Sequence, residues 1–348
     1  MESKTRNVEP FYWLLGSAAL VIVIAGISSA RSLVVPLLIS AFIAVVCTPA
    51  LQWLQRKGIP GWLAILIVFL AVSVVVLVVA AIMTGSIASF ISNSDKYTEK
   101  IGAEKEKLMT WIESLGIPVS GKINEVLDPK RLVRFTTSVL LSLTNAFSNA
   151  FLVLLTVLFI LVEAAGFPRK LLAIAQGNSS ILDQATKIRT AIAHYVSLKT
   201  AVSLLTGVLV GILVSVLGID FPLLWAMLAF FFNYIPNIGS VLAAVPAVIL
   251  ALVQHGLSTA LIAAGGYAVI NIVIGNVVEP RMMGKGLGLS TLVVFISLVF
   301  WGWLLGPVGM LLSVPLTMIV KIVMEGFEET RWLSVLLGSN PEPESGKA

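Results

Sequence analysis

The stretch WLAILIVFLAVSVVVLVVAAIMTGSIASFI, residues 62–91, contains neither a charged residue nor a proline. A helix of about 20 mostly apolar residues crosses the hydrocarbon core of a bilayer, so this stretch can cross with a tilt or project beyond it. The whole chain agrees, because 58% of its 348 residues are hydrophobic and only 12% are charged, against about 25% charged in a soluble domain. The sequence therefore predicts an all-α polytopic membrane protein with the lipid bilayer as its surroundings.

Further apolar runs raise the expected number of transmembrane helices to about eight. The predicted spans lie at about 11–30, 32–51, 62–91, 138–162, 195–217, 221–253, 257–278 and 290–320. Two of them are interrupted by proline and glycine close together, in NYIPNIGS at 233–240 and GPVG at 306–309. Proline removes a backbone donor and frees a carbonyl one turn earlier, so we expect broken or hairpin helices at both places.

The region 221–253 could form one overlong helix or two shorter helices hinged at NYIPNIGS. Basic loops of membrane proteins lie mostly in the cytoplasm. A hairpin that enters and returns to the same side puts Arg281 and Lys285 on the side of the other basic loops, whereas a single crossing does not. The charge pattern therefore favours the hairpin.

Charge also divides the chain into regions. The segment 92–135 carries both signs and apolar residues at helical spacing, whereas 163–194 is mainly basic. With the N-terminus inside, the positive-inside tendency places both termini in the cytoplasm. The expected regions are N-terminal transmembrane helices at 1–91, a periplasmic amphipathic segment at 92–135, a transmembrane transport core at 136–325 with a basic cytoplasmic connector at 163–194, and a cytoplasmic tail at 326–348.

Several classes of chemistry find no support in the sequence. The single cysteine, Cys47, can form neither an intramolecular disulfide nor a multi-cysteine metal site, and His194 and His255 lack partners at ligand spacing. GKGLGLS at 284–290 is not a nucleotide-binding P-loop. The net charge of +5 comes without a basic run interleaved with aromatics, so nucleic acid is not an expected partner. We predict no catalytic residue, metal or cofactor, and therefore no enzyme.

Paired Gly/Pro interruptions in apolar segments are the best sequence pointer to the binding region of a transporter. The alternative is a tight interhelical turn at the membrane surface. Asn271 and Asn276 could line a pore or bind neighbouring helices. The candidates for a substrate pathway and its hinges are Asn233, Pro236, Asn237, Gly239, Asn271, Asn276, Pro307 and Gly309.

Charged side chains within membrane segments are costly and usually functional. Asp220 could be a proton-carrying carboxylate or a hydrated N-cap before Pro222. Glu279 and Arg281 could form an interfacial ion pair or a gate, and Lys199 is expected at the cytoplasmic end of span 195–217. The candidates for ion or proton coupling are Asp220, Glu163, Glu279 and Arg281.

Two long motifs resemble the signature of the autoinducer-2 exporter family. They are NYIPNIGSVLAAVPAVIL (233–250) and GNVVEPRMMGKGLGLSTLVVFISLVFWGWLLGPVGMLLSVPLT (275–317), and the resemblance is strongest across about 190–325. It implies a transporter of the bacterial inner membrane that exports autoinducer-2, a small polar quorum-sensing signal, by secondary transport or facilitated efflux, and so affects biofilm behaviour. It also implies a homo-oligomer, expected to be a homopentamer.

The resemblance leaves a second transport activity open, because the family is also thought to include sodium/proton antiporters. In that alternative Asp220, Glu163 or Glu279 would titrate. A third class is a non-transporting membrane scaffold that uses 92–135 as its partner-binding surface.

Overall fold

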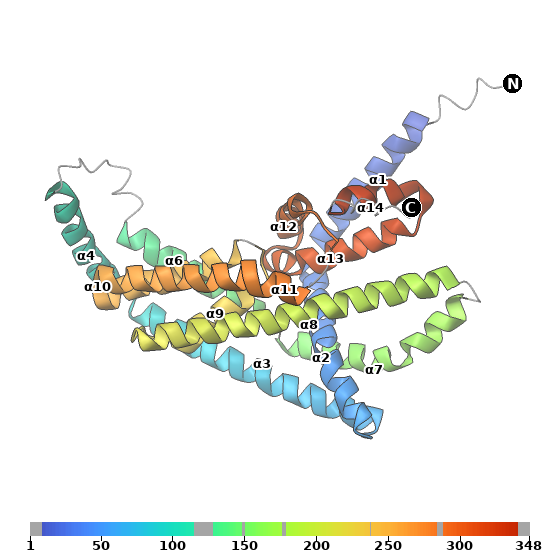
Figure 1. Ribbon diagram of the computed structural model, residues 1–348, viewed down its shortest axis with the longest axis horizontal. Coiled ribbons are helices and arrows are strands. Elements are labelled where there is room, and N and C mark those ends of the chain that lie inside the picture. Colours follow the sequence, from blue (N-terminus) through green and yellow to red (C-terminus); the bar gives the residue numbers. More distant parts are fainter. Residues whose placement is uncertain are drawn as a thin grey trace, which may run out of the picture.

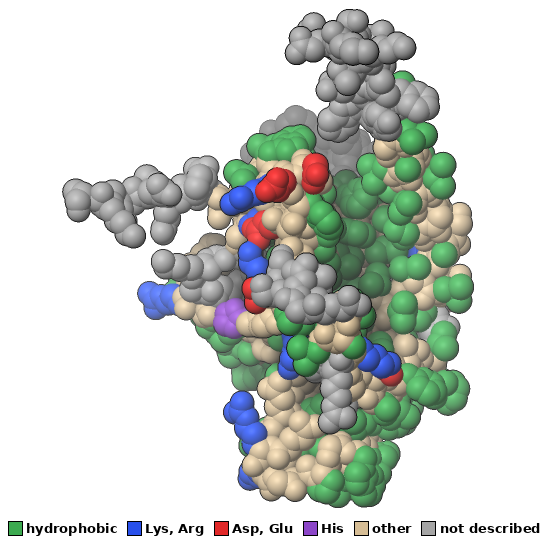
Figure 2. Space-filling view, turned by 90° about the vertical axis from the view of Figure 1, so that its right-hand side faces the viewer, with side chains coloured by type: hydrophobic (Ala, Val, Ile, Leu, Met, Phe, Trp, Pro, Cys, Tyr) green, Lys and Arg blue, Asp and Glu red, His purple; other side chains and the backbone are tan. Residues whose placement is uncertain are grey.

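The computed structural model describes residues 9–114, 128–147, 150–175, 179–236, 238–283 and 288–339, which form helices and short connections without a strand among them. Five described helices are long and apolar enough to cross a membrane, and shorter apolar helices accompany them. Hydrophobic side chains cover much of the face in Figure 2, whereas the charged side chains lie mainly towards the left and centre of the view. Water-soluble proteins rarely expose such large apolar surfaces, so the predicted all-α membrane class is confirmed.

The long helices α3 and α8 run along most of the molecule, with α4 at one end and the α7–α8 corner at the other (Figure 1). The N-terminal half of the chain consists of α1 (Glu9–Ser29), α2 (Arg31–Arg56), α3 (Gly61–Ser92), α4 (Ser94–Ser114), α6 (Pro129–Phe147) and α7 (Ala150–Ala175). The rest consists of α8 (Ser179–Val216), α9 (Pro222–Phe232), α10 (Gly239–Val273), the π-helical turn η1 (Ile274–Val278), α11 (Glu279–Met283), α12 (Thr291–Leu305), α13 (Pro307–Glu325), the 3₁₀ turn η2 (Glu328–Thr330) and α14 (Arg331–Leu337).

The span predicted at 138–162 is not one helix, and this prediction was wrong. Its residues are divided between α6, which ends at Phe147, and α7, which begins at Ala150. The sequence SLTNAFSNA at 142–150 contains several polar side chains within the apolar pattern. Such residues favour turns and helix ends over a helix interior, which accounts for a boundary inside this run.

Helix α8 is the element against which much of the C-terminal half packs. It contacts α2, α7, α9, α10, α11 and α13. It comes close to α9, where a Cβ at Gly207 would lie 2.8 Å from the carbonyl oxygen of Ala226. Gly207 and Gly211 form a small-xxx-small pair, a pattern that lets two helix backbones come close.

Residues 222–255 form what we call the first hairpin. Helix α9 ends at Phe232, the chain breaks, and α10 begins at Gly239. The two ends of the hairpin meet, because the backbone N–H of Asp220 donates to Gln254 Oε1 at 3.0 Å and the Gln254 amide donates to the Asp220 carboxylate. The predicted break and the predicted hairpin at 233–240 are both confirmed.

Gly256 then folds α10 back on itself. Its φ of 80° and ψ of −174° are non-helical and lie in a region that essentially only glycine adopts. Residues 257–273 therefore form a separate run from 239–255, which agrees with the separate spans predicted at 221–253 and 257–278.

Helices α12 and α13, residues 291–325, form the second hairpin. They meet at Gly306, whose φ of 71° and ψ of −151° place it in the same glycine-specific region as Gly256. At the open end, Lys321 Nζ donates to the carbonyl oxygen of Gly288 at 2.7 Å. The break predicted at 306–309 is confirmed as the tip of a hairpin.

The largest buried cluster joins the first hairpin to α4. Leu224, Trp225 and Leu228 of α9 are completely buried in it, and Tyr97 and Ile101 of α4 pack into the same cluster. The apolar face of α4 therefore covers the open end of the first hairpin instead of standing apart from the core.

Candidate functional site

The first hairpin runs along the C-terminal half of α8. At its open end, His255 Nε2 lies 3.0 Å from the carbonyl oxygen of Gly218, just after α8 ends. At its tip, the hydroxyl of Tyr234 donates to Thr200 Oγ1 at 2.7 Å. The tip therefore reaches a point near the middle of α8.

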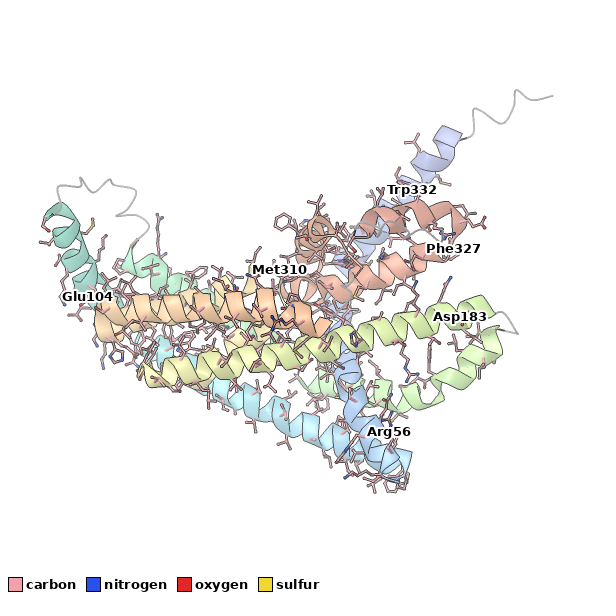
Figure 3. The ribbon with its side chains drawn as sticks, in the orientation of Figure 1. Arg56, Glu104, Asp183, Met310, Phe327 and Trp332 are labelled. Atoms are coloured by element: carbon pink, nitrogen blue, oxygen red, sulfur yellow. The ribbon has the colours of Figure 1, made fainter. Side chains whose placement is uncertain are left out.

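The second hairpin approaches the same region from the other end of α8. At its open end, Glu325 of α13 forms an ion pair with Lys187 near the start of α8. Further along α13, Val314 packs with Tyr195 and Val196 of α8. Figure 3 shows Asp183 towards one end of α8 and Glu104 of α4 at the opposite end of the molecule. The two hairpins thus point towards each other, and their tips converge near the middle of α8.

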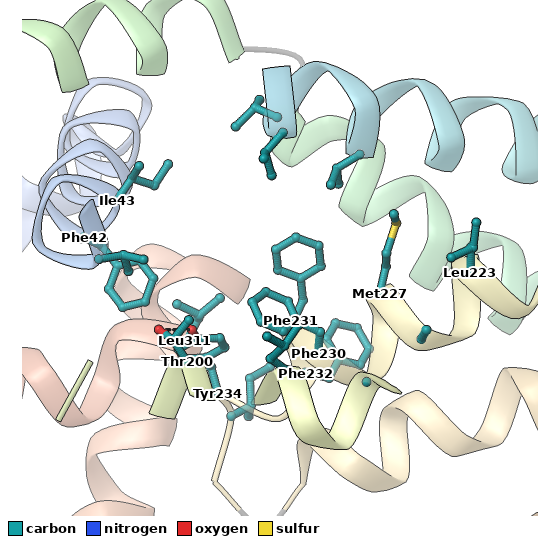
Figure 4. A pocket seen from close by; sticks show the side chains of 18 of the residues that line it. Phe42, Ile43, Thr200, Leu223, Met227, Phe230, Phe231, Phe232, Tyr234 and Leu311 are labelled. Atoms are coloured by element: carbon teal, nitrogen blue, oxygen red, sulfur yellow. Dashed lines mark hydrogen bonds between the residues drawn. The ribbon is translucent and has the colours of Figure 1, made fainter. Parts of the chain in front are cut away.

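A cavity of about 1120 Å³ lies where the hairpins converge. Its wall includes Phe230 and Tyr234 of the first hairpin, Leu311 of the second, and Phe42 of α2 (Figure 4). The lining side chains are mostly hydrocarbon, and the hydrogen bond between Thr200 and Tyr234 lies on this wall. The cavity by itself is therefore a poor site for a small polar solute.

Polar side chains gather on one turn of α8 beside that wall. Lys199, only 5% exposed, donates to Glu279 Oε1 at 2.5 Å. Ser203 is completely buried and accepts a hydrogen bond from Asn233 Nδ2 at 3.0 Å. We call the following residues the polar cluster: Tyr195, Lys199, Thr200 and Ser203 of α8, Asn233 and Tyr234 of the first hairpin, and Glu279 of α11.

Tyr195 lies on α8 one turn before Lys199 and is almost fully buried. The ion pair and the tip of the first hairpin are neighbours, because the consecutive residues Lys199 and Thr200 bind Glu279 and Tyr234 respectively.

The π-helical turn η1 positions Glu279. It occupies Ile274–Val278, so Glu279 is the first residue after it. A π-helical turn inserts an extra residue into a helix and is frequent at functional sites. The insertion sets the direction in which the Glu279 side chain leaves the helix, towards Lys199.

One sequence interpretation changes at this ion pair. Glu279 pairs with Lys199, whereas Arg281 is exposed on α11. Helix α8 continues for five turns on the N-terminal side of Lys199, so the ion pair lies near the middle of that helix. The connector predicted at 163–194 includes residues 179–194 of α8, which continue without a break into the apolar half of the helix.

The glycines predicted as hinges have a steric role in the two hairpins. A Cβ at Gly239 would overlap the carbonyl oxygen of Phe232, and one at Gly309 would overlap that of Trp301. Each hairpin therefore closes at its tip only because a glycine lets the preceding helix end come close. Pro236 lies in the first break and Pro307 begins α13, while Asn237 lies outside the described residues.

Asp220 holds the open end of the first hairpin. Its side chain is exposed and accepts from Gln254, and Phe221, not Asp220, is the N-cap of α9. Asp220 also lies near Tyr97 of α4, where burial, and secondarily the Asp220 charge, raises the pKa of the tyrosine hydroxyl. These contacts give Asp220 a structural setting outside the polar cluster.

The remaining candidates also lie outside the polar cluster. Glu163 is exposed on α7 and forms an ion pair with the exposed Lys170. Asn271 and Asn276 have exposed side chains, on α10 and η1 respectively. No group of three or more potential metal ligands occurs among the residues that the structure describes.

Five members of the polar cluster were absent from the sequence-based candidates: Tyr195, Lys199, Thr200, Ser203 and Tyr234. A signal for three of them exists in KTAVS at 199–203, where polar residues at positions i, i+1 and i+4 enter an otherwise apolar helix. Residues four apart share one helix face, but only the tertiary structure shows which elements that face meets.

The fold and the site define a class. Oppositely directed broken helices that converge on buried polar groups are a design of membrane transporters. The sequence model of the protein family described as "AI-2E family transporter" matches residues 17–329 of the chain. The chain therefore belongs to the AI-2E transporter family, as its motifs indicated.

Individual relatives support the same assignment. The chain is 41% identical to the AI-2 transport protein TqsA of Escherichia coli (strain K12), over 91% of its own length and 93% of that protein. It is 38% identical to a putative transport protein of Haemophilus influenzae, over 96% and 98% of the two chains. It is also 38% identical to the putative transport protein YhhT of Escherichia coli, over 97% of each.

Proposed function

We propose that the protein exports autoinducer-2, a small polar quorum-sensing signal, across the bacterial inner membrane by secondary transport or facilitated efflux. The observation that carries the proposal is the convergence of the two hairpins on the polar cluster of α8. The similarity to TqsA, whose name states AI-2 transport, supports the choice of solute. Export of the signal would lower its intracellular level and so affect quorum sensing and biofilm behaviour.

The hairpin tips supply movable contacts. Tyr234 and Asn233 attach the first tip to α8 through two side-chain hydrogen bonds. A neutral hydrogen bond contributes only about 0.5–1.5 kcal/mol to stability, so both can exchange for bonds to a solute at low cost. Release of the first tip, with the second hairpin still against the other half of α8, opens the polar cluster from one end only.

The charge pattern supports the orientation that we propose for the protein in the membrane. The basic residues of 163–194 favour a cytoplasmic location for that connector, and with it cytoplasmic termini. We further propose that the protein acts as a homo-oligomer, because a homopentamer is expected for the family.

Transport of the labelled signal tests the proposal. Inverted membrane vesicles from cells that make the protein should accumulate labelled autoinducer-2 faster than vesicles from cells that lack it. Dissipating the proton gradient separates secondary transport, which slows, from facilitated efflux, which does not. Equal uptake by the two vesicle preparations would refute the export of this solute.

A sodium/proton antiporter is the second candidate, because Glu279 is a carboxylate within the polar cluster. In proteoliposomes that contain a pH-sensitive dye, an antiporter would move protons when sodium is added, without any movement of autoinducer-2. Signal transport without a sodium-dependent pH change would favour the exporter.

A further inference from the structure

We propose that the polar cluster is the solute-binding site, and that it selects uncharged, hydroxyl-rich solutes because Lys199 and Glu279 neutralise each other. This inference rests on the proposed transport function and narrows it to a site and a substrate class. It assigns roles to three residues that the sequence-based candidates did not include: Thr200, Ser203 and Tyr234.

The location of the ion pair is the first argument. Lys199 lies near the middle of α8 and is 5% exposed, and the side chain of Glu279 is 21% exposed. Removing two charges from water costs several kcal/mol per ion, and their mutual attraction often does no more than compensate. A pair of apolar residues would hold α8 and α11 together at least as well, so stability alone gives little reason for this pair.

The second argument is the hydrogen-bonding capacity of the polar cluster. Three α8 residues within five positions each bond to another element: Lys199 to Glu279, Thr200 to Tyr234, and Ser203 to Asn233. A solute hydroxyl can donate to a carboxylate and accept from an ammonium, an amide or another hydroxyl. A molecule with several hydroxyl groups can therefore replace these internal bonds one for one.

Access is the third argument. Thr200 and Tyr234 belong to the polar cluster and also line the cavity between the hairpins. Figure 4 shows their hydrogen bond at the cavity wall, beside Leu311. Breaking this one bond would free two hydroxyl groups on the cavity wall, one of them on the residue that follows Lys199 in α8.

Charge balance determines the selectivity. A cation that reaches Glu279 is repelled by Lys199, and an anion that reaches Lys199 is repelled by Glu279, at distances where the low dielectric of the interior strengthens both effects. An uncharged solute meets neither barrier. A carboxylate without the lysine would instead attract cations.

Equilibrium binding of labelled autoinducer-2 to the purified full chain in lipid nanodiscs tests the site. Thr200→Val, Ser203→Ala and Tyr234→Phe each remove one hydroxyl, and each should raise the Kd about 3- to 10-fold. Thr206→Val is the matched control, because Thr206 is also buried on α8 but donates only to the carbonyl of Val202 in its own helix. The control should keep the wild-type Kd.

Ion flux tests the charge balance. In proteoliposomes, Lys199→Gln should admit labelled sodium and Glu279→Gln should admit labelled chloride, each at least about tenfold faster than wild type, a difference of 1.4 kcal/mol in the barrier. The double variant should admit neither. If a single variant does not fold, the double variant carries the test, because it should exclude both ions and still bind the signal more weakly than wild type.

The outcomes separate this inference from the proposed function. Wild-type export of the signal with an unchanged Kd in all three hydroxyl variants would overturn the site and leave export intact. Binding of labelled ribose but not autoinducer-2, lost in the same variants, would support the site and overturn the proposed solute. A double variant that conducts either ion would overturn the charge-balance argument.

Discussion

The ammonium nitrogen of Lys199 lies 2.5 Å from Glu279 Oε1, which joins α8 to α11 across 80 positions of sequence. The ion pair lies beside the tip of the first hairpin, because Thr200, the residue after Lys199, accepts a hydrogen bond from Tyr234 of that tip. The ion pair thus attaches α11, the short helix after the π-helical turn η1, to α8. The attachment lies at the part of α8 where the hairpins converge. The contribution of the ion pair to stability, the glycines at the two hairpin tips and the contacts of the first hairpin can each be tested separately.

Lys199→Met should destabilise the protein strongly. The substitution leaves the Glu279 carboxylate partly buried without a counter-charge, which lowers the free energy of unfolding by about 3–5 kcal/mol. Glu279→Leu added to Lys199→Met should recover most of this loss, because no charge then stays behind. Denaturant titration in detergent micelles measures both. A double variant as unstable as the single one would show that the charge is not the cause.

Gly239→Ala and Gly309→Ala should each lower the free energy of unfolding by about 1–3 kcal/mol or more and reduce transport. Each new methyl group overlaps a carbonyl oxygen at a hairpin tip, that of Phe232 or Trp301. Gly265→Ala is the matched control, because nothing lies within 4 Å of a Cβ there. The control should be neutral or stabilising by about 0.5–1 kcal/mol, since alanine favours a helix. Thermal unfolding and vesicle uptake measure the three variants.

Asp220→Asn should leave transport and its dependence on the proton gradient nearly unchanged. Asparagine keeps an oxygen that accepts from Gln254, and the backbone bond of residue 220 to Gln254 stays in place. Gln254→Leu removes both bonds at once and should increase amide hydrogen exchange at the open end of the first hairpin. Loss of proton-driven flux in Asp220→Asn alone would instead give this carboxylate a coupling role.

Asn233→Ala and Pro236→Ala should lower transport more than they lower the amount of protein in the membrane. Asn233 attaches the hairpin tip to Ser203, and Pro236 lies in the break that forms the tip. Thr156→Val, at an exposed position of α7 where the hydroxyl bonds within its own helix, is the control. Uptake per unit of protein, measured by immunoblot, gives the comparison. Equal losses of transport and protein would mean that the two residues serve folding alone.

Much of the architecture could be predicted because its causes are local. The absence of charge over 62–91 predicts a long apolar helix, and α3 occupies Gly61–Ser92. Pro236 lies in one break and Pro307 begins the helix that follows the other, because proline lacks the backbone N–H that a helix interior needs. The pairing at Asp220 and Gln254 then confirms the hairpin that the charge pattern favoured.

The partners within the site could not be predicted in the same way. Glu279 is two residues from Arg281 and 80 from Lys199, so proximity in sequence suggests the wrong partner. Thr200 and Ser203 look like ordinary helix residues, since hydroxyl groups commonly bond to their own helix. Their role depends on the hairpin tip that reaches them.

The sequence by itself determined the membrane class, most of the apolar helices and the breaks at 233–240 and 306–309, because hydrocarbon burial and backbone hydrogen bonding act over one or two helical turns. Only the tertiary structure decided that the two hairpins converge on the middle of α8 and that Lys199 faces Glu279. Those relationships depend on how helices distant in sequence pack, at glycines such as Gly207 and Gly239 that let backbones come close. Helix packing, unlike helix formation, has no signature within a single turn.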